Sequence, residues 1–444
     1  MRIAIFFLLA LSACLALPDA SDSEEDTMQE DDAPLGPRDF SLRGDPNFHP
    51  DQLSEEARVW YDRLLVAIEN PRQYQNAERT AQSGNMQRYS RVVNMYVTSL
   101  LAVFRATGDL RLLDEVDRIA QIMRGELVDH WIDMNDSRID ASTDHMRWLW
   151  LGSSSRYYGR DDHVMDSART HGMIARVAWA FENNRDLESP SGVDYGERAD
   201  FWKNYLLEHF EPVWRSGSPY TSREWPRPVH SRHGHPFPEI IAYHYYLFKL
   251  TGEEVWYENA VSFVDQIYDT IRDEDSLVAG GFVEVETALG SAYVWPHRFP
   301  DGAHPNFAST MRAQPTGYSR YVYASMLDLE LEGLVRVVEE ETVVKMANSL
   351  AYFQVDLNGE DIVFYSGVTG DQEVGGIPPA SPDGNTMWDA RWAVSPPALF
   401  AGWDESGTIR TVNQIVYDTI EDDRDNPRRI FVPAGMLIAE ILVS

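Results

Sequence analysis

Residues 103–122 read VFRATGDLRLLDEVDRIAQI, and residues 247–267 repeat the same pattern as LFKLTGEEVWYENAVSFVDQI. In each copy an amphipathic run ends at Thr-Gly, an acidic residue follows, and a second amphipathic run begins. Gly108 and Gly252 can adopt the positive φ that closes a helix, and the acidic residue after each would lie in the positively polarised first turn of the next helix. Each copy therefore predicts an α-hairpin.

Apolar residues recur at helical spacing through most of the chain. The helical segments that this spacing predicts are 53–69, 87–106, 110–131, 165–184, 195–210, 237–250, 254–272, 317–332 and 335–352. We expect a mainly α protein, an (α/α) toroid or barrel of about five to seven helical hairpins, with an open solenoid as the alternative. Segments 276–298 and 353–366 carry β-like runs and turn residues, and we expect small β-hairpin insertions there.

The N-terminus has the layout of an export signal. Met1-Arg2 precede a short apolar run that ends near Cys14, the single cysteine. Leu11-Ser12-Ala13-Cys14 resembles the bacterial lipoprotein cleavage box, so residues 1–14 are expected to be a lipoprotein signal peptide with Cys14 lipidated. The alternative is an incidental cysteine in a signal that is cut near Ala16 or Ala20.

A strongly acidic segment follows the expected signal. Residues 19–32 hold eight carboxylates and no cation, so we expect residues 15–49 to be an acidic disordered tether. Residues 50–444 would then form a single catalytic toroid. The expected location is that of an exported bacterial lipoprotein, at the outer membrane, the cell surface or in the periplasm, held to the membrane through its lipid anchor only.

The charge of the chain limits its partners. With 71 Asp+Glu against 38 Lys+Arg, the formal net charge is −33, which excludes nucleic acid as an expected partner. Only three of the cations are lysines. An acidic, lysine-poor surface suits a salty environment, because salt screens self-repulsion.

The loops that lead into the expected inner helices of a toroid are rich in polar and aromatic residues. Arginine binds carboxylates bidentately, aromatic faces stack on sugar rings, and His with Tyr can move protons. This combination suits a uronic-acid polysaccharide as substrate. The candidate substrate-binding residues are Arg88, Arg169, His233, Arg312, Gln314, Arg320 and Trp388.

Three segments carry a resemblance to a known group of enzymes. They are HMRWLWLGSSSRYYGRDDHVMDSARTHGMIARVAWAF, HSRHGHPFPEIIAYHYYLFKLTG and MRAQPTGYSRYVYASML. They resemble the helical-toroid polysaccharide lyases, in particular the alginate and glucuronan lyases of polysaccharide lyase families 38 and 5. The resemblance implies a carbon-oxygen lyase that cleaves alginate, polymannuronate or glucuronan by β-elimination. We expect no cofactor and no metal.

The resemblance also implies roles for individual residues. Similar proteins use a Tyr as base and acid, with His, Arg and an amide or second His around the uronate carboxylate. Tyr318 is the candidate that would remove the C5 proton and return it to the leaving 4-oxygen, with Arg320 nearby. His235 or His171 would serve in an anti elimination or assist the carboxylate. The Asn-His pair of family 5 is not matched, because Thr170 precedes His171.

Other functions compete with this interpretation. A glycoside hydrolase would use two carboxylates, for instance Asp162 with Glu239 or Asp389. A uronyl epimerase shares the proton abstraction, and a non-catalytic glycan-binding lipoprotein fits the tether and the aromatic content. The histidines at 230, 233 and 235 could also form a zinc site, completed by Glu239.

Overall fold

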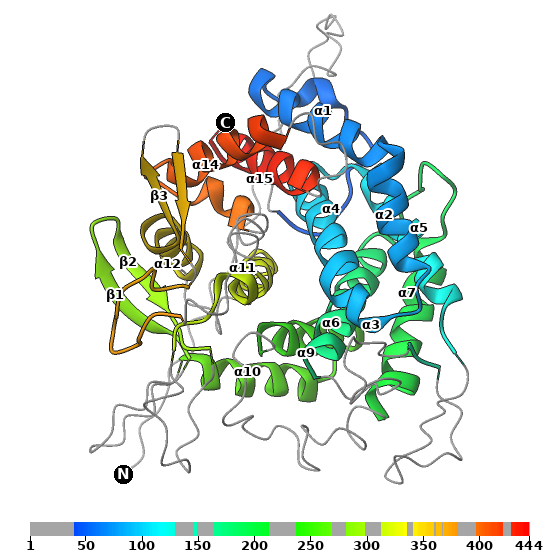
Figure 1. The fold of residues 1–444 in the computed structure, drawn as a ribbon. Coiled ribbons are helices and arrows are strands. Elements are labelled where there is room, and N and C mark those ends of the chain that lie inside the picture. Colours follow the sequence, from blue (N-terminus) through cyan, green and yellow to red (C-terminus); the bar gives the residue numbers. More distant parts are fainter. Residues whose placement is uncertain are drawn as a thin grey trace, which may run out of the picture. The chain divides into compact units, whose positions relative to one another are not determined.

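The computed structural model (Figure 1) divides the chain into two compact units, Met1–Ala33 and Pro34–Ser444. The residues described are 40–128, 146–148, 164–212, 237–268, 281–297, 312–334, 341–358, 361–365, 367–380, 397–420 and 428–443. The predicted signal peptide and Cys14 lie outside them.

The described part of the chain is mainly α-helical, as predicted. Its α-helices are α1 (Glu55–Glu69), α2 (Pro71–Ala81), α3 (Met86–Arg88), α4 (Asn94–Thr107), α5 (Leu110–Gly125), α6 (Val164–Glu182), α7 (Tyr195–Asn204), α9 (Phe237–Thr251), α10 (Glu254–Tyr268), α11 (Thr316–Leu331), α12 (Thr342–Ser349), α14 (Thr408–Ile420) and α15 (Arg428–Val443). Three π-helical turns continue or precede them: η3 (Tyr89–Val93), η4 (Tyr205–Phe210) and η6 (Leu350–Gln354). Among the described residues, no helix is long and apolar enough to cross a membrane.

Helices α2, α14 and α15 were not predicted. Helix α2 is mostly polar and offers only a few apolar residues that could reveal a helical spacing, whereas α15 is apolar on most sides and contains Pro433. Helix α15 packs on the 3₁₀ helix η8 (Pro397–Gly402), and a Cβ on Gly435 would come within 2.2 Å of Ala398 O. Gly435 interrupts the apolar pattern of α15, and the same glycine allows the close contact between α15 and η8.

The two repeated hairpins close as predicted. Gly108 and Gly252 have φ angles of 75° and 71° at the ends of α4 and α9. The threonine before each glycine donates its hydroxyl to a carbonyl one turn back, and the same oxygen accepts from the backbone N–H two residues on (Thr107 to Asp109 3.2 Å, Thr251 to Glu253 3.1 Å). The Thr-Gly pair thus satisfies backbone groups that the helix end leaves open. Figure 1 shows α9 and α10 side by side.

Both β-insertions are two-stranded antiparallel hairpins, in the segments where β-like runs predicted them. Strand β1 (Val283–Thr287) pairs with β2 (Gly290–Val294) from Val283 opposite Val294. Strand β3 (Val355–Asn358) pairs with β4 (Asp361–Phe364) from Val355 opposite Phe364.

The packed part of the chain begins earlier than the expected boundary at residue 50. Phe40 and Leu42 are buried. The backbone N–H of Gly44 donates to Asn184 Oδ1 at 2.7 Å, and that of Asp45 donates to Gly108 O at 2.9 Å. Residues 40–45, expected in the tether, therefore belong to the folded unit, because the apolar side chains of Phe40 and Leu42 pack into its core.

Helices α6 and α9 approach each other closely at Gly172. A Cβ at this position would lie 2.9 Å from Glu239 O and 3.1 Å from its Oε2. Only a glycine lets the two backbones meet there without displacement. The consequence is that the beginning of α9 lies directly against the first half of α6.

Candidate functional site

The start of α11 is held by a short extended segment. Backbone hydrogen bonds run from His297 N to Arg312 O at 2.7 Å and from Gln314 N to Trp295 O at 3.0 Å. Isolated bridges pair Pro296 with Ala313 and Pro315 with Gly367. The chain after β2 and the chain before α11 are thereby fixed side by side, and the helix begins directly after Pro315.

This arrangement brings Gln314, His297 and Tyr318 together. Gln314 is fully buried, and its Nε2 donates to His297 Nδ1 at 2.9 Å. The ring centroids of His297 and Tyr318 are 5.5 Å apart, and the Tyr318 side chain is 41% exposed. Because Nδ1 accepts this hydrogen bond, a neutral His297 carries its proton on Nε2.

A second tyrosine lies one turn further along α11. Tyr321 is 4% exposed and accepts a hydrogen bond at its hydroxyl from Arg320 Nη2. The Cζ atom of Arg169, at the start of α6, lies 3.1 Å from the centroid of the Tyr321 ring. Two arginines that the sequence offered as substrate-binding residues, Arg169 and Arg320, therefore meet across one buried phenol.

The guanidinium groups set the proton affinity of this phenol. Burial opposes ionisation of Tyr321, but the positive charges of Arg169 and Arg320 outweigh it, so that the pKa of Tyr321 lies below its usual value. For Arg169, burial lowers the pKa, while the nearby Tyr321 and Glu239 act to raise it. The cluster therefore favours negative charge at the phenol oxygen.

The π-helical turn η3 holds Arg169 from the other side. Ser90 accepts a hydrogen bond from Arg169 Nη2 at its carbonyl oxygen and donates its hydroxyl to Asp166. Asn94 Nδ2 donates to Arg169 O at 2.8 Å. Asp166 also has Arg91 Nε at 3.9 Å. Ser90 on this π-helical turn therefore contacts α6 through both its backbone and its side chain.

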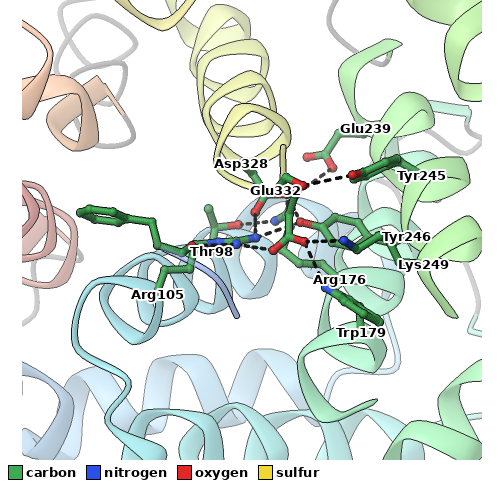
Figure 2. A network of polar contacts seen from close by, with 11 residues as sticks. Thr98, Arg105, Arg176, Trp179, Glu239, Tyr245, Tyr246, Lys249, Asp328 and Glu332 are labelled. Carbon is green, nitrogen blue, oxygen red and sulfur yellow. Dashed lines mark hydrogen bonds and ion pairs between the residues drawn. The ribbon is translucent and has the colours of Figure 1, made fainter. Parts of the chain in front are cut away.

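The opposite halves of the same helices are joined by a buried polar network (Figure 2). Asp328 accepts from Arg105 Nη2 at 2.9 Å, from Arg176 Nε at 2.7 Å and from Tyr246 at 2.7 Å. Glu332 accepts from Arg105 and, at 3.0 Å, from Trp179 Nε1. Other members are Thr98, Tyr245 and Lys249.

This network is a structural feature of the fold. Its members come from α4, α6, α9 and α11, and Arg105, Arg176 and Asp328 are all buried. Buried charges are costly unless they are paired and hydrogen-bonded, and here Asp328 and Glu332 are the carboxylates that pair with Arg105 and Arg176. The network therefore fixes the positions of the four helices that carry the candidate site at their other ends.

Glu239 lies between the network and the Tyr321 cluster. It is 1% exposed, and its Oε2 is 3.9 Å from Arg176 Nη2. Burial raises the pKa of Glu239, against the opposing influence of Arg176 and Arg169. A carboxylate this deeply buried does not match the exposed pair that a hydrolase needs. The partners considered for it, Asp162 and Asp389, lie outside the described residues.

His171 lies in a buried aromatic cluster and not beside Tyr318. Its Nδ1 lies 2.8 Å from Ser167 O, its Nε2 lies 3.1 Å from the Tyr205 hydroxyl, and its ring stacks on Phe210 with centroids 3.4 Å apart. Burial lowers the pKa of His171 to about 3. The ring is therefore neutral at ordinary pH and fills the core between α6 and η4.

The remaining predicted site residues are placed only in part. Arg88 is exposed on α3, and Met86 O on that helix accepts from Thr170 Oγ1 of α6 at 3.3 Å. Arg312 is exposed next to the Gln314 segment. The predicted residues His233, His235 and Trp388 lie outside the described residues, as does His230. Within the described ranges, no group of three or more His, Cys, Asp or Glu could hold a metal ion.

Sequence reasoning missed His297 and Tyr321. His297 lies in the β-like stretch 276–298, which was interpreted only as an insertion. Tyr321 follows Arg320 directly and lies three residues after Tyr318, on the same side of α11. The Tyr-Ser-Arg-Tyr order at 318–321 was a usable signal, whereas nothing in the sequence connects His297 with Gln314.

No protein-family model matches the chain, and a comparison with curated proteins finds no match either.

Proposed function

We propose that the chain is a lyase that cleaves a uronic-acid polysaccharide by β-elimination, with Tyr318 as its base and acid. The observation that carries this proposal is the exposed Tyr318 ring beside His297, which is hydrogen-bonded to the buried Gln314. Arg312 and Arg320 flank the same helix start. A phenol, an oriented imidazole and two guanidinium groups are what removal of a proton next to a carboxylate requires.

In the proposed reaction the uronate carboxylate is held by Arg312 or Arg320 and by the Nε2 proton of His297. Neutralising this carboxylate makes the C5 proton more acidic, because the negative charge that develops is shared with it. The Tyr318 oxygen, as phenolate, takes the C5 proton. The bond from C4 to the glycosidic oxygen breaks as the C4–C5 double bond forms, and Tyr318 returns the proton to the leaving oxygen.

The local charge supports an acidic substrate in spite of the net charge of −33. Arg169 and Arg320 meet at Tyr321, and the exposed Arg312 lies four residues before the start of α11. The carboxylates nearest to Arg169 are engaged: Asp166 by Ser90 and Arg91, and Glu239 in the neighbourhood of Arg176. A cationic start of α11 attracts a polyanion at short range, where salt does not screen.

We further propose that the helical hairpins close into an (α/α) toroid, with α4, α6, α9 and α11 as inner helices. The buried network that joins these four helices supports this arrangement. Their N-terminal ends would then face one rim, on which Tyr318 lies.

The test is a panel of polymannuronate, polyguluronate, glucuronan and pectate, assayed for the ultraviolet absorbance of the conjugated unsaturated uronate that elimination creates. Tyr318→Phe is expected to abolish product formation from the substrate that wild type cleaves. Tyr352→Phe is the matched control, because Tyr352 is a similarly exposed tyrosine (44%) on η6, and it is expected to leave activity unchanged.

Other outcomes would replace the proposal. New reducing ends without unsaturated product would indicate hydrolysis. Proton exchange at C5 without chain cleavage would indicate an epimerase. Binding of a polyuronate that Tyr318→Phe does not weaken, with no cleavage of any substrate in the panel, would indicate a glycan-binding protein.

A further inference from the structure

Tyr321 is surrounded by hydrogen-bond donors. Its hydroxyl accepts from Arg320 Nη2, and the Arg169 guanidinium packs on its ring, with Cζ 3.1 Å from the centroid. Among the described residues, nothing accepts a hydrogen bond from the Tyr321 hydroxyl. A neutral phenol would leave its own proton without an acceptor in this buried position, which costs free energy, whereas a phenolate has no such proton.

The buried positive charge of Arg169 also favours an ionised Tyr321. This side chain is fully buried, and its Nε and Nη1 atoms make no hydrogen bond in the part of the chain that the structure describes. Nor does a described carboxylate lie within ion-pair distance of it. A buried guanidinium without a counter-charge is strongly unfavourable. Among the described residues, the Tyr321 phenol contacts both Arg169 and Arg320 and can supply a negative charge.

Other buried tyrosines of this chain are arranged in the opposite way. Tyr246 also accepts from an arginine, Arg105, but donates its hydroxyl to Asp328 at 2.7 Å, and burial together with Asp328 raises its pKa well above the usual value. Tyr61 donates to Asp109. Each of these phenols donates a hydrogen bond to a carboxylate. Tyr321 is instead in contact with two guanidinium groups.

We propose that Tyr321 is a buried tyrosinate that acts as the internal counter-anion of Arg169 and Arg320 and holds Arg320 in position at the start of α11. Asp166 and Arg169 face this cluster from α6 and Glu239 faces it from α9, while Met95 of α4 and Phe431 of α15 cover the ring with apolar atoms. Ionisation breaks the O–H bond of Tyr321 and releases its proton to solvent. The positioning role rests on the proposed function, and the ionisation does not.

The ionisation is tested by ultraviolet difference spectroscopy, since tyrosinate absorbs at longer wavelength than tyrosine. Wild type minus Tyr321→Phe is expected to show the spectrum of one tyrosinate at neutral pH. The matched control is Tyr323→Phe, on the same helix: burial raises the pKa of Tyr323, whose hydroxyl accepts from Gln354, so its difference spectrum at neutral pH is that of a neutral phenol. A neutral phenol in the Tyr321 difference spectrum would overturn the proposal.

A second variant tests the ionisation without removing Tyr321, in case Tyr321→Phe disturbs the fold. Arg320→Gln keeps the phenol and removes one guanidinium, so the tyrosinate band is expected to appear only at a higher pH than in wild type. If Tyr321 in folded Arg320→Gln ionised at the same pH as it does in wild type, the counter-anion role of Tyr321 would be contradicted.

The positioning role has a separate readout on a polyuronate that wild type cleaves. Tyr321→Phe is expected to raise KM about tenfold and to leave kcat within about twofold, because it misplaces a group that binds substrate and does not touch the base. Loss of kcat with unchanged KM would contradict positioning. If no substrate is cleaved by wild type, the proposed function fails, and the spectroscopic result still decides the tyrosinate.

Discussion

Gln314 donates from Nε2 to His297 Nδ1 at 2.9 Å, and this hydrogen bond joins the segment before α11 to the segment after β2. It selects the tautomer of His297 that carries its proton on Nε2. A partly exposed histidine is thereby given a fixed orientation beside the exposed ring of Tyr318.

Replacing Gln314 with Leu should therefore lower activity on the cleaved substrate. Leucine has a similar volume but cannot donate to His297, so the imidazole loses its preferred tautomer and orientation, and kcat/KM should fall roughly tenfold or more. The control is Gln354→Leu, which removes a buried amide that donates to Tyr323 and should lower Tm without lowering kcat/KM of the folded enzyme. Equal losses of activity in the two variants would refute a special role for Gln314.

The Arg105–Arg176–Asp328 part of the network should dominate stability. Asp328→Asn leaves two buried guanidinium groups without their shared carboxylate, and we expect a loss of about 3 to 5 kcal/mol in the free energy of unfolding. Asp186→Asn, which removes the partner of Arg43 in an exposed pair, should change stability little. Chemical denaturation measures both, and a similar small effect of the two substitutions would show that the buried network is energetically neutral.

Glu239 should make stability decrease as pH rises. Because burial raises its pKa in the folded state, the folded protein holds this proton more tightly than the unfolded chain does. Its contribution is fully present below the unfolded pKa of about 4.5 and is lost as pH rises through the raised folded value. Glu239→Gln removes this dependence, so the stability difference, variant minus wild type, should increase over that range.

Denaturation of both proteins at several pH values checks this prediction, since the difference cancels the titration of the many other acids. A stability difference that stays constant with pH would mean that the pKa of Glu239 is the same in the folded and unfolded states.

Gly172→Ala should destabilise the contact between α6 and α9. The added Cβ would lie 2.9 Å from Glu239 O, so the backbones must separate, at a cost of about 1 to 3 kcal/mol. Gly125→Ala at the end of α5 is the matched control, because its Cβ meets nothing within 4 Å. Thermal denaturation should show a lower Tm for the first variant only. A Tm for Gly172→Ala at or above that of wild type would show that α6 and α9 have room to move apart.

Local sequence patterns predicted the elements well. The two Thr-Gly hairpins and both β-hairpins follow from short-range rules of periodicity, capping and turn formation, which act within a few residues. Tyr318, Gln314 and Arg312 also appeared together, since they occupy a single stretch of seven residues, 312–318. Helix α15 escaped because its apolar residues are not confined to one face.

The partners of these residues were decided by the tertiary structure. His297 meets Gln314 where residues 295–297 pair with residues 312–314, and Arg169 meets Tyr321 from 152 positions away. In the sequence, Arg169 is one of 35 arginines and Tyr321 one of 21 tyrosines. Their burial against each other distinguishes these two residues from the other arginines and tyrosines. The proton affinity of a phenol depends on the charges around it and on the exclusion of water. Periodicity along the chain determined where the helices form, and long-range packing determined which charges are buried together.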